Sequence, residues 1–341
     1  MPLALRLRPW LRWLVPAALL ALALWPALAG GADAAGSAAA SAAVDAAAGA
    51  LGGGPGGTAE PWPWWALALA LFALTGVLGV LAVLAGIGGG VLFVPIVSGL
   101  MPFVHIDFVR GAGIMVALTG ALAAGPRLIQ AGLADLRLSI PVALAASAGS
   151  YFGAVVGLQL PVAAVQLTLG LVILATVALM AFVRPREQAG AGRPDRLASW
   201  LGIGGTYREA GSDATLAWRP QAMVAGIVLF AGIGFMAGLF GLGAGWANVP
   251  VLNLVMALPL RLSVGTSYFV LAIAGPSAAL VYLASGAMQP LVVVPSVLGI
   301  MLGARLGTWL LVRTRTAVLR RIVIGVLLVA GLRALLRGLG L

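Results

Sequence analysis

Long apolar segments separated by short polar breaks dominate the chain. The first five segments lie at about 64–85, 88–101, 108–125, 138–158 and 162–183. The second five lie at about 221–240, 245–258, 265–284, 290–312 and 317–336. A helix needs about 20 apolar residues to cross a hydrocarbon core of roughly 30 Å, because each residue adds about 1.5 Å. The pattern therefore predicts an all-α, polytopic transmembrane protein.

The second segment of each set of five is unusually short. Segments 88–101 and 245–258 each hold about fourteen residues, or roughly 21 Å of helix. Both begin near glycines, and each contains a proline, Pro95 in the first and Pro250 in the second. Because a proline inside a helix removes a hydrogen bond and kinks the helix, we expect a structural kink at both positions. Each short segment is therefore predicted to be a broken or half helix.

The two sets of five also match in sequence. The run Gly-Ile-Gly-Gly-Gly-Val-Leu-Phe-Val-Pro at 86–95 aligns without gaps with Gly-Leu-Gly-Ala-Gly-Trp-Ala-Asn-Val-Pro at 241–250. Further on, glycines and prolines continue to pair: Gly113 with Gly265, Pro141 with Pro295, Gly149 with Gly303, and Gly153 with Gly307. Matching runs at equivalent places indicate an internal repeat. We assign transmembrane repeat 1 to 62–183 and repeat 2 to 220–341.

The chain before the first repeat is predicted to contain a targeting signal and a linker. Residues 1–29 combine an arginine-rich start, an apolar stretch at 13–24 and the small-residue site Ala27-Leu28-Ala29, as in a signal peptide. An uncleaved signal anchor is the alternative. Residues 30–61 are mostly Ala and Gly, which predicts a disordered linker. The tryptophans that follow, Trp62, Trp64 and Trp65, are typical of an aromatic belt at the membrane surface.

Composition supports a membrane protein. Of the 341 residues, 62% are hydrophobic and 9% are charged, and the mean hydropathy is +1.11, whereas about a quarter of the residues of a soluble domain are charged. The absence of cysteine excludes disulfides, thiolate metal sites and cysteine nucleophiles. With one His and nine acidic residues, we expect no protein-built metal site and no cofactor. The sequence shows no Ser/His/Asp constellation and no pair of intramembrane carboxylates, so these signs of an enzyme are missing.

The distribution of arginine predicts the orientation. All 20 basic residues are Arg, giving a net charge of +11. Most of them lie in the breaks between apolar segments, which argues for topology signals rather than nucleic-acid binding. If the short segments cross, each half has five crossings and repeat 2 is inverted. Counting from an outside start at Trp62, the inside breaks then carry Arg127, Arg137, the six Arg of 184–219, Arg261, Arg313 and Arg315. The outside breaks carry Arg110, Arg333 and Arg337.

The alternative topology has re-entrant short segments. Each half would then cross four times, and the arginine-rich stretch 184–219 would lie outside. The positive-inside rule favours the inverted arrangement, with 184–219 as a cytoplasmic connecting loop, although Arg333 and Arg337 at the end of the chain speak against it. We therefore expect a multi-pass protein of the inner (plasma) membrane with inverted halves.

At the two glycine-rich runs, and at Ser263-Val-Gly-Thr-Ser267 after the second, the sequence resembles the TauE/SafE sulfite exporter family. The likeness covers roughly residues 64–336. It implies a permease, often for small sulfur-containing or organic anions such as sulfite, sulfoacetate, sulfolactate or thiosulfate. The sequence departs from the family pattern at Ala244, which replaces a glycine, and at the bulky Trp246. Repeat 1 also has Gly113-Ile-Met115 where repeat 2 has Gly265-Thr-Ser267, so the polar site is expected to favour repeat 2.

Glycines at the starts of the short helices are candidates for substrate binding. A half helix that begins in mid-membrane offers unpaired N–H groups and the positive end of its dipole, which suits an anion. Glycine allows the backbone to approach the ligand and to adopt positive φ. We place Gly88, Gly89 and Gly90 in the first opening, with Gly243 and Gly245 in the second. The alternative is that these glycines only permit close helix packing.

Polar side chains near the second opening complete the predicted site. Asn248, Thr266, Ser267 and Tyr268 can donate hydrogen bonds to substrate oxygens, although Thr266 and Ser267 can instead bond their own helix. Arg305 lies inside segment 290–312, and an intramembrane charge is costly and usually functional. We expect it to face the anion; the alternative is a partner among carbonyls or lipid headgroups.

Two other groups of residues are weaker candidates. Thr119 is a possible hydroxyl donor in repeat 1. His105 and Asp107 form a titratable pair that can relay a proton, but their predicted place in an outside turn favours ordinary solvated side chains.

These expectations together describe transport of a small anion, with export as the expected direction. No carboxylate lies within an apolar segment, so we expect no proton or sodium site. Outward movement of one negative charge gains about 2.3 kcal/mol per 100 mV when the interior is negative, which makes facilitated export feasible. An anion channel and a non-transporting membrane scaffold or assembly factor remain the alternative functions.

Overall fold

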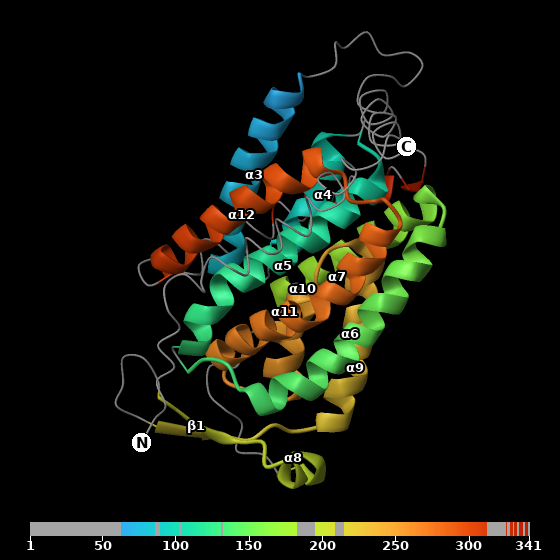
Figure 1. Cartoon of the computed structure of the whole chain (residues 1–341). Helices are drawn as coiled ribbons and strands as arrows, with labels where there is room; N and C mark the ends of the chain where they lie inside the picture. Colours follow the sequence, from blue (N-terminus) through green and yellow to red (C-terminus); the bar gives the residue numbers. More distant parts are fainter. Residues whose placement is uncertain are drawn as a thin grey trace, which may run out of the picture.

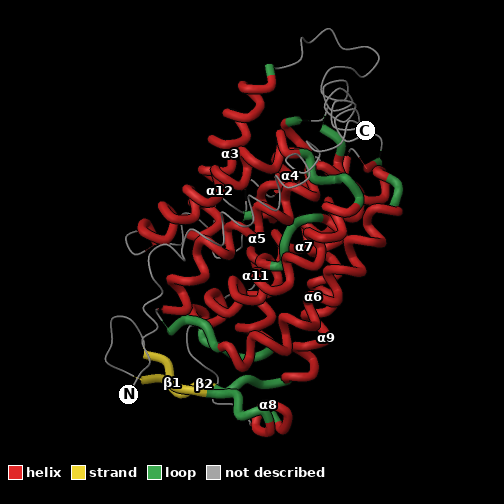
Figure 2. The backbone as a smooth tube through the Cα atoms, in the orientation of Figure 1, coloured by secondary structure: helices red, strands yellow, loops and turns green. Residues whose placement is uncertain are grey.

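The computed structural model describes residues 63–85, 89–101, 104–130, 132–182, 195–208 and 215–311, and part of 325–339. The predicted signal segment and linker, and most of the last apolar segment, lie outside the described residues. Within the described part the chain is almost entirely helical (Figures 1 and 2).

Helices follow the predicted segments closely. The first set comprises α3 (Trp64–Ala85), α4 (Gly90–Leu100), α5 (Ile106–Gln130), α6 (Leu136–Gln159) and α7 (Val162–Phe182). The second comprises α9 (Met223–Phe240), α10 (Gly245–Pro250), the π-helix η1 (Val251–Val255), α11 (Leu260–Ala284) and α12 (Pro290–Leu311). Six of the described helices, α3, α5, α6, α9, α11 and α12, are long and apolar enough to cross a membrane. The all-α, multi-pass membrane fold is therefore confirmed.

Helix pairing joins the two sets of helices. α3 packs along α12, and α6 packs along α9, so that each set places its first long helix against the fourth segment of the other (Figure 1). Glycines make both contacts close. A Cβ on Gly153 of α6 would collide with the backbone of Phe235, and a Cβ on Gly303 of α12 would collide with the backbone of Gly76. This exchange of helices is what two related halves would produce; the internal repeat itself stays a prediction.

A small folded unit occupies part of the stretch that the sequence predicted only as a connecting loop. Helix α8 (Arg196–Trp200) precedes an antiparallel hairpin of β1 (Gly205–Arg208) and β2 (Thr215–Trp218). Asp195 caps α8 by accepting a hydrogen bond from the Leu197 amide, and Trp218 is buried in a cluster with residues of α6 and α9. Strands of four residues give too short a pattern to be recognised from hydropathy alone.

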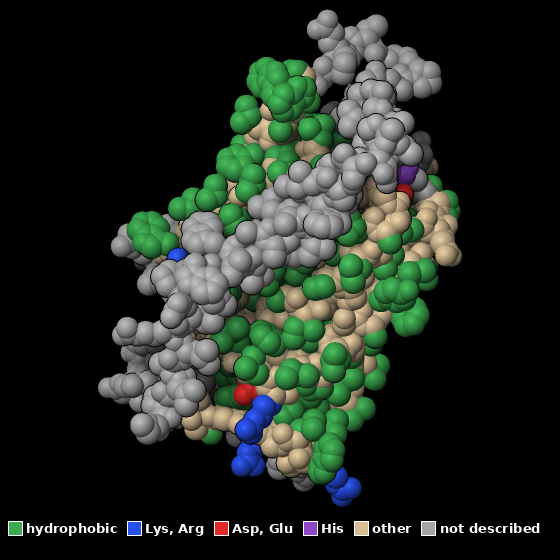
Figure 3. Space-filling model, viewed as in Figure 1, with side chains coloured by type: hydrophobic (Ala, Val, Ile, Leu, Met, Phe, Trp, Pro, Cys, Tyr) green, Lys and Arg blue, Asp and Glu red, His purple; other side chains and the backbone are tan. Residues whose placement is uncertain are grey.

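The polar breaks gather at two opposite ends of the bundle. At one end, Arg137 donates to the carbonyl of Gly202, and the Gln221 amide donates to the carbonyl of Met256. At the other end, Gly111 of the first turns of α5 packs against Ala287. Apolar side chains cover the helices between the ends, and blue Arg side chains gather near α8 (Figure 3). This sorting of the breaks is what the inverted topology requires, while the side that faces the cytoplasm stays a prediction.

Candidate functional site

The two short helices begin next to each other, about halfway along α5. A Cβ on Gly90, the first residue of α4, would collide with the carbonyl oxygen of Leu242 in the turn that precedes α10. The same added atom would lie 2.8 Å from the carbonyl oxygen of Gly113 and 2.9 Å from the Cβ of Ala117, both on α5. Because α5 runs from Ile106 to Gln130, these contacts lie near its centre. We call this meeting point the half-helix junction.

From the half-helix junction the short helices run to opposite ends of the bundle. Helix α4 has 11 residues and ends beside the turn that leads into α5. Helix α10 and η1 have 6 and 5 residues and end where Met256 bonds Gln221. Each path corresponds to roughly 16 Å of α-helix, or about half of the hydrocarbon core. The two short helices thus lie where the sequence predicted them, and each is shorter than the roughly 21 Å expected.

The candidate glycines are buried and tightly packed. Gly89 has an ordinary helical φ of −66°, whereas Gly243 has a φ of +70°, which favours glycine. An added Cβ on either residue would lie 2.6 Å from a side-chain atom, Cδ1 of Ile300 for Gly89 and Cβ of Ala117 for Gly243. Gly245 is buried as the first residue of α10, and Gly88 lies outside the described residues. Close packing is therefore a role that these glycines have, and ligand contact stays a prediction.

The two prolines lie in different local structures. Pro95 is buried within α4, which continues past it to Leu100. Pro250 is the last residue of α10, and the chain then widens into the π-helix η1. The amide of Val251 donates to the carbonyls of both Ala247 and Asn248 at this change. Since proline cannot donate, a change from α to π geometry is a natural accommodation of Pro250.

Several buried polar side chains on α5, α10, α11 and α12 have no hydrogen-bond partner among the described residues. Asn248 of α10 is fully buried, and both its Oδ1 and its Nδ2 lack a partner. The hydroxyl groups of Thr119 on α5, Thr266 on α11 and Ser296 on α12 are buried and unpartnered as well. Nearly all buried polar groups in proteins are satisfied, so each exception calls for a ligand, a water or a functional reason.

The remaining predicted side chains lie on the same helices. Ser267 and Tyr268 are buried on α11, and the Tyr268 hydroxyl donates to the carbonyl of Ala82 at 3.5 Å, the limit of a hydrogen bond. Tyr268 belongs to an apolar cluster that also includes Ala117, Ala247 and Ala304. Helices α5, α10, α11 and α12 therefore meet in this region. Arg305, which follows Ala304, is only partly buried.

Among the residues that the structure describes, the fully buried charge is Arg110, which the sequence suggested only as a charge in an outside break. Its side chain is 1% exposed. Nη1 donates to Oδ1 of Asp107 at 2.7 Å and to the carbonyl of Gly157 at 3.2 Å, and Nη2 donates to the carbonyl of Leu239. The available signal was the spacing of Asp107 and Arg110, an i,i+3 ion pair at the start of an apolar segment. Its partners on α6 and α9 are distant in sequence, and no local pattern predicts them.

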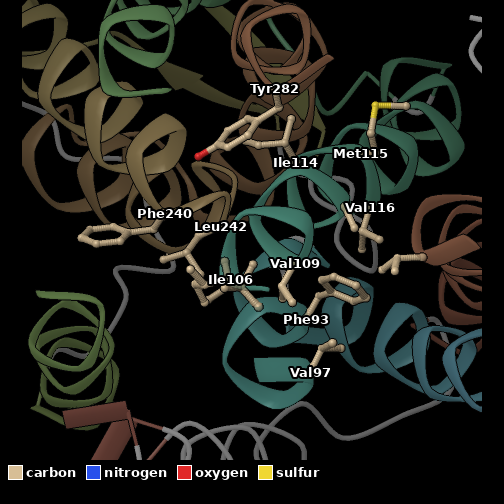
Figure 4. Packing of buried hydrophobic residues seen from close by; sticks show 14 of the residues in the cluster. Phe93, Val97, Ile106, Val109, Ile114, Met115, Val116, Phe240, Leu242 and Tyr282 are labelled. Carbon is tan, nitrogen blue, oxygen red and sulfur yellow. The ribbon is translucent and has the colours of Figure 1, made fainter. Parts of the chain in front are cut away.

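Buried apolar side chains of α4 and α5 pack next to the half-helix junction. Val109 and Val116 of α5 lie beside Phe93 of α4, and Ile114 lies beside Tyr282 of α11 (Figure 4). A groove of about 550 Å³ lies elsewhere, on the outer surface between α3 and α12, where it is lined by residues such as Trp64, Phe72 and Pro290. Because its walls are apolar, it is not suited to a small polar solute.

Comparison with known proteins identifies the family. The sequence model of the family described as "Sulfite exporter TauE/SafE" matches residues 69–334. A relative from Bacillus subtilis (strain 168), described as "Probable membrane transporter protein YunE", is 26% identical over 264 residues, which cover 74% of this chain and 92% of the relative. No solved structure matches the chain. The chain therefore belongs to the sulfite exporter TauE/SafE family and is a multi-pass membrane transporter.

Proposed function

We propose that the protein is a permease that exports a small anion, such as sulfite or a sulfonate, across the inner membrane, and that the anion binds at the half-helix junction. The main support is the unpartnered amide of Asn248, which is fully buried on the element that begins there. A buried amide with neither donor nor acceptor satisfied costs free energy, and a ligand that bonds it in transit explains that cost.

The chemistry of the proposed site suits an oxyanion. Asn248, Thr266, Ser267 and Tyr268 carry neutral N–H and O–H donors, which bind anionic oxygens without a permanent buried charge. The start of α4 adds backbone N–H groups and the positive end of a helix dipole. The glycines allow the backbones to approach closely. In this scheme Arg305 attracts the anion toward the site from its partly exposed position on α12.

The driving force in this proposal is the membrane potential. With the cell interior negative, export of a monovalent anion gains about 2.3 kcal/mol per 100 mV, and export of a dianion gains about twice that. No separate coupling ion is needed. Transport into inside-out vesicles should therefore rise when a positive-inside potential is imposed.

A flux assay tests the proposal directly. The full chain is reconstituted into vesicles, and uptake of sulfite, a sulfonate, thiosulfate and acetate is measured with and without a potassium–valinomycin potential. We expect saturable, potential-dependent uptake of at least one sulfur oxyanion in excess over protein-free vesicles. Absence of uptake for all the anions, or uptake that ignores the potential, would count against the proposal.

The two alternative functions give different results in the same assay. An anion channel would show flux that does not saturate and that is little affected by the identity of the small anion. A scaffold or assembly factor would show no flux, and its cellular role would survive both Asn248→Ala and Arg305→Ala. In the proposed permease each of these substitutions lowers flux while the protein is still inserted.

A further inference from the structure

We propose that Arg110 is an anion-responsive gate residue at the His105–Asp107 end of the bundle, which closes the pathway through protein partners and opens it by exchanging those partners for the passing anion. This inference rests on the proposed anion transport. It concerns a residue outside the half-helix junction and a cluster that the binding site does not use.

The closed arrangement is visible in the contacts of the guanidinium group. From α5 it reaches the carbonyl of Gly157 near the end of α6 and the carbonyl of Leu239 near the end of α9. The Cζ atom of Arg110 lies 5.6 Å from the ring centroid of Tyr282 on α11. The Tyr282 hydroxyl donates to the carbonyls of Gly238 at 2.8 Å and Leu239 at 3.4 Å. One side chain thus connects four helices, two from each predicted half.

The contact with α9 also fixes the entrance to the half-helix junction. Leu239 is followed by Phe240, the last residue of α9, and then by Gly241, where the chain turns toward α10. Gly241 has a φ of +68°, and an added Cβ there would collide with the backbone of Arg110. Loss of the bond from Nη2 to the Leu239 carbonyl would therefore free the end of α9, two residues before the turn that leads toward α10.

The positions of Asp107 and Arg110 are charged in the first half only. In the predicted alignment of the two halves, Gly113 pairs with Gly265, so Leu262 stands at the position of Arg110 and Pro259 at the position of Asp107. Leu262 is buried in an apolar cluster with Leu138 and Met256 near the opposite end. A purely structural contact between the halves is thus made there without charge. Since a buried charge is expensive, its presence at one end alone points to a function in handling anions.

One partner of Arg110 is in contact with the aqueous surface, and one of its own donors is unused. Asp107 is 27% exposed and lies 3.5 Å from Nδ1 of His105, so its carboxylate is in contact with the aqueous surface. Among the described residues Nε of Arg110 has no partner although it is buried. An oxyanion can accept from Nε and Nη2 together in the bidentate geometry that guanidinium groups favour. The exchange keeps the charge paired throughout, which avoids the cost of a bare buried guanidinium group.

The proposal predicts opposite effects for the two members of the ion pair. Asp107→Asn removes the negative charge beside the guanidinium group, which repels an approaching anion, so the KM for sulfite uptake should fall by several-fold. Arg110→Gln removes the charge, so the KM should rise by about tenfold or more, as expected when a charge-assisted bond is lost. Arg110→Lys keeps the charge but loses the planar, bidentate geometry of the guanidinium group, so its uptake should lie between those of the wild type and Arg110→Gln. A structural role alone would lower the amount of folded protein in each variant and leave KM unchanged.

Distance measurements test the gate without relying on flux. The chain contains no cysteine, so spin labels can be attached at introduced cysteines only. Gln159→Cys with Ser285→Cys reports on the end near Arg110, and Gln130→Cys with Arg261→Cys reports on the opposite end; all four positions are exposed. Arg110→Gln should broaden or lengthen the distances of the first pair and leave the second pair unchanged. Tyr282→Phe, which keeps the charge, should produce a smaller change of the same kind.

The outcomes separate this proposal from the proposed function. If wild-type vesicles take up no anion, the proposed function fails, while the distances still report whether Arg110 holds that end closed. If flux is present but Asp107→Asn and Arg110→Gln shift KM in the same direction, the exchange of partners is wrong. If folded Arg110→Gln or, where that variant does not fold, Asp107→Asn and Tyr282→Phe leave both KM and the first distance pair unchanged, Arg110 is not a gate.

Discussion

At the scale of single residues, two buried asparagines on the broken segment of the second half show the contrast between support and function. Nδ2 of Asn253 donates to the carbonyl of Leu258 at 2.8 Å and holds the end of η1 in place. Asn248 lies five residues earlier, is equally buried, and has no partner among the described residues. The same side chain is therefore satisfied by the protein at one position and, in our proposal, by the substrate at the other.

Replacing each asparagine by leucine gives a prediction and its control. Asn248→Leu removes a buried amide that bonds nothing, so thermal stability in detergent should stay the same or increase, while sulfite flux should fall at least about tenfold. Asn253→Leu leaves a buried carbonyl without its donor and should cost about 1–3 kcal/mol of stability. The measurements are thermal unfolding and vesicle uptake of both purified variants. A stable Asn248→Leu protein with normal uptake would exclude this amide from the substrate site.

At the scale of helices, the contact between α6 and α9 depends on glycines that admit no side chain. A Cβ on Gly234 of α9 would collide with the backbone of Ala146, whereas a Cβ on Gly232, two residues earlier on the same helix, meets open space. In a membrane, helices associate through close packing of this kind rather than through the hydrophobic effect. An added side chain is therefore costly at Gly234 and tolerated at Gly232, although the two residues are close in sequence.

This difference predicts opposite effects of the same substitution. Gly234→Ala should separate α6 from α9 and destabilise the protein by about 1–3 kcal/mol or more, because the backbone atoms that it meets cannot move aside cheaply. Gly232→Ala should be neutral or stabilise by up to about 1 kcal/mol, since alanine favours a helix. Thermal unfolding of both variants in the same detergent is the measurement, and equal melting temperatures would contradict the packing argument.

Helix positions were largely predictable, because apolar length and glycine–proline punctuation are local signals. The short helix predicted at 88–101 is found at Gly90–Leu100. Helix boundaries with polar ends were less accurate: α11 begins at Leu260, five residues before the predicted segment, since its first turn carries Arg261 and Ser263. The partners of Arg110 were not predictable at all, because they are backbone carbonyls of helices 47 and 129 residues away.

At the scale of the whole molecule, orientation depends on how the charged breaks are sorted. The end that carries α8 and the hairpin also holds Arg137 and Arg261, whereas the end near Ala287 holds Asp107, with Arg110 buried beneath the surface. The positive-inside rule counts arginines near the ends of the helices and predicts that the α8 end faces the cytoplasm. The gate at Arg110 would then face the side to which an exported anion is released.

Cysteine labelling checks this orientation without perturbing the core. The natural chain has no cysteine, and Thr206 on β1 and Ser285 after α11 are both exposed. A membrane-impermeant maleimide applied to intact spheroplasts should label Ser285→Cys and leave Thr206→Cys unlabelled until the membrane is opened. Arg137→Cys, at the α8 end, should behave as Thr206→Cys does. Labelling of Thr206→Cys from outside would reverse the orientation, and Arg110 would then gate the entry of the anion from the cytoplasm rather than its release.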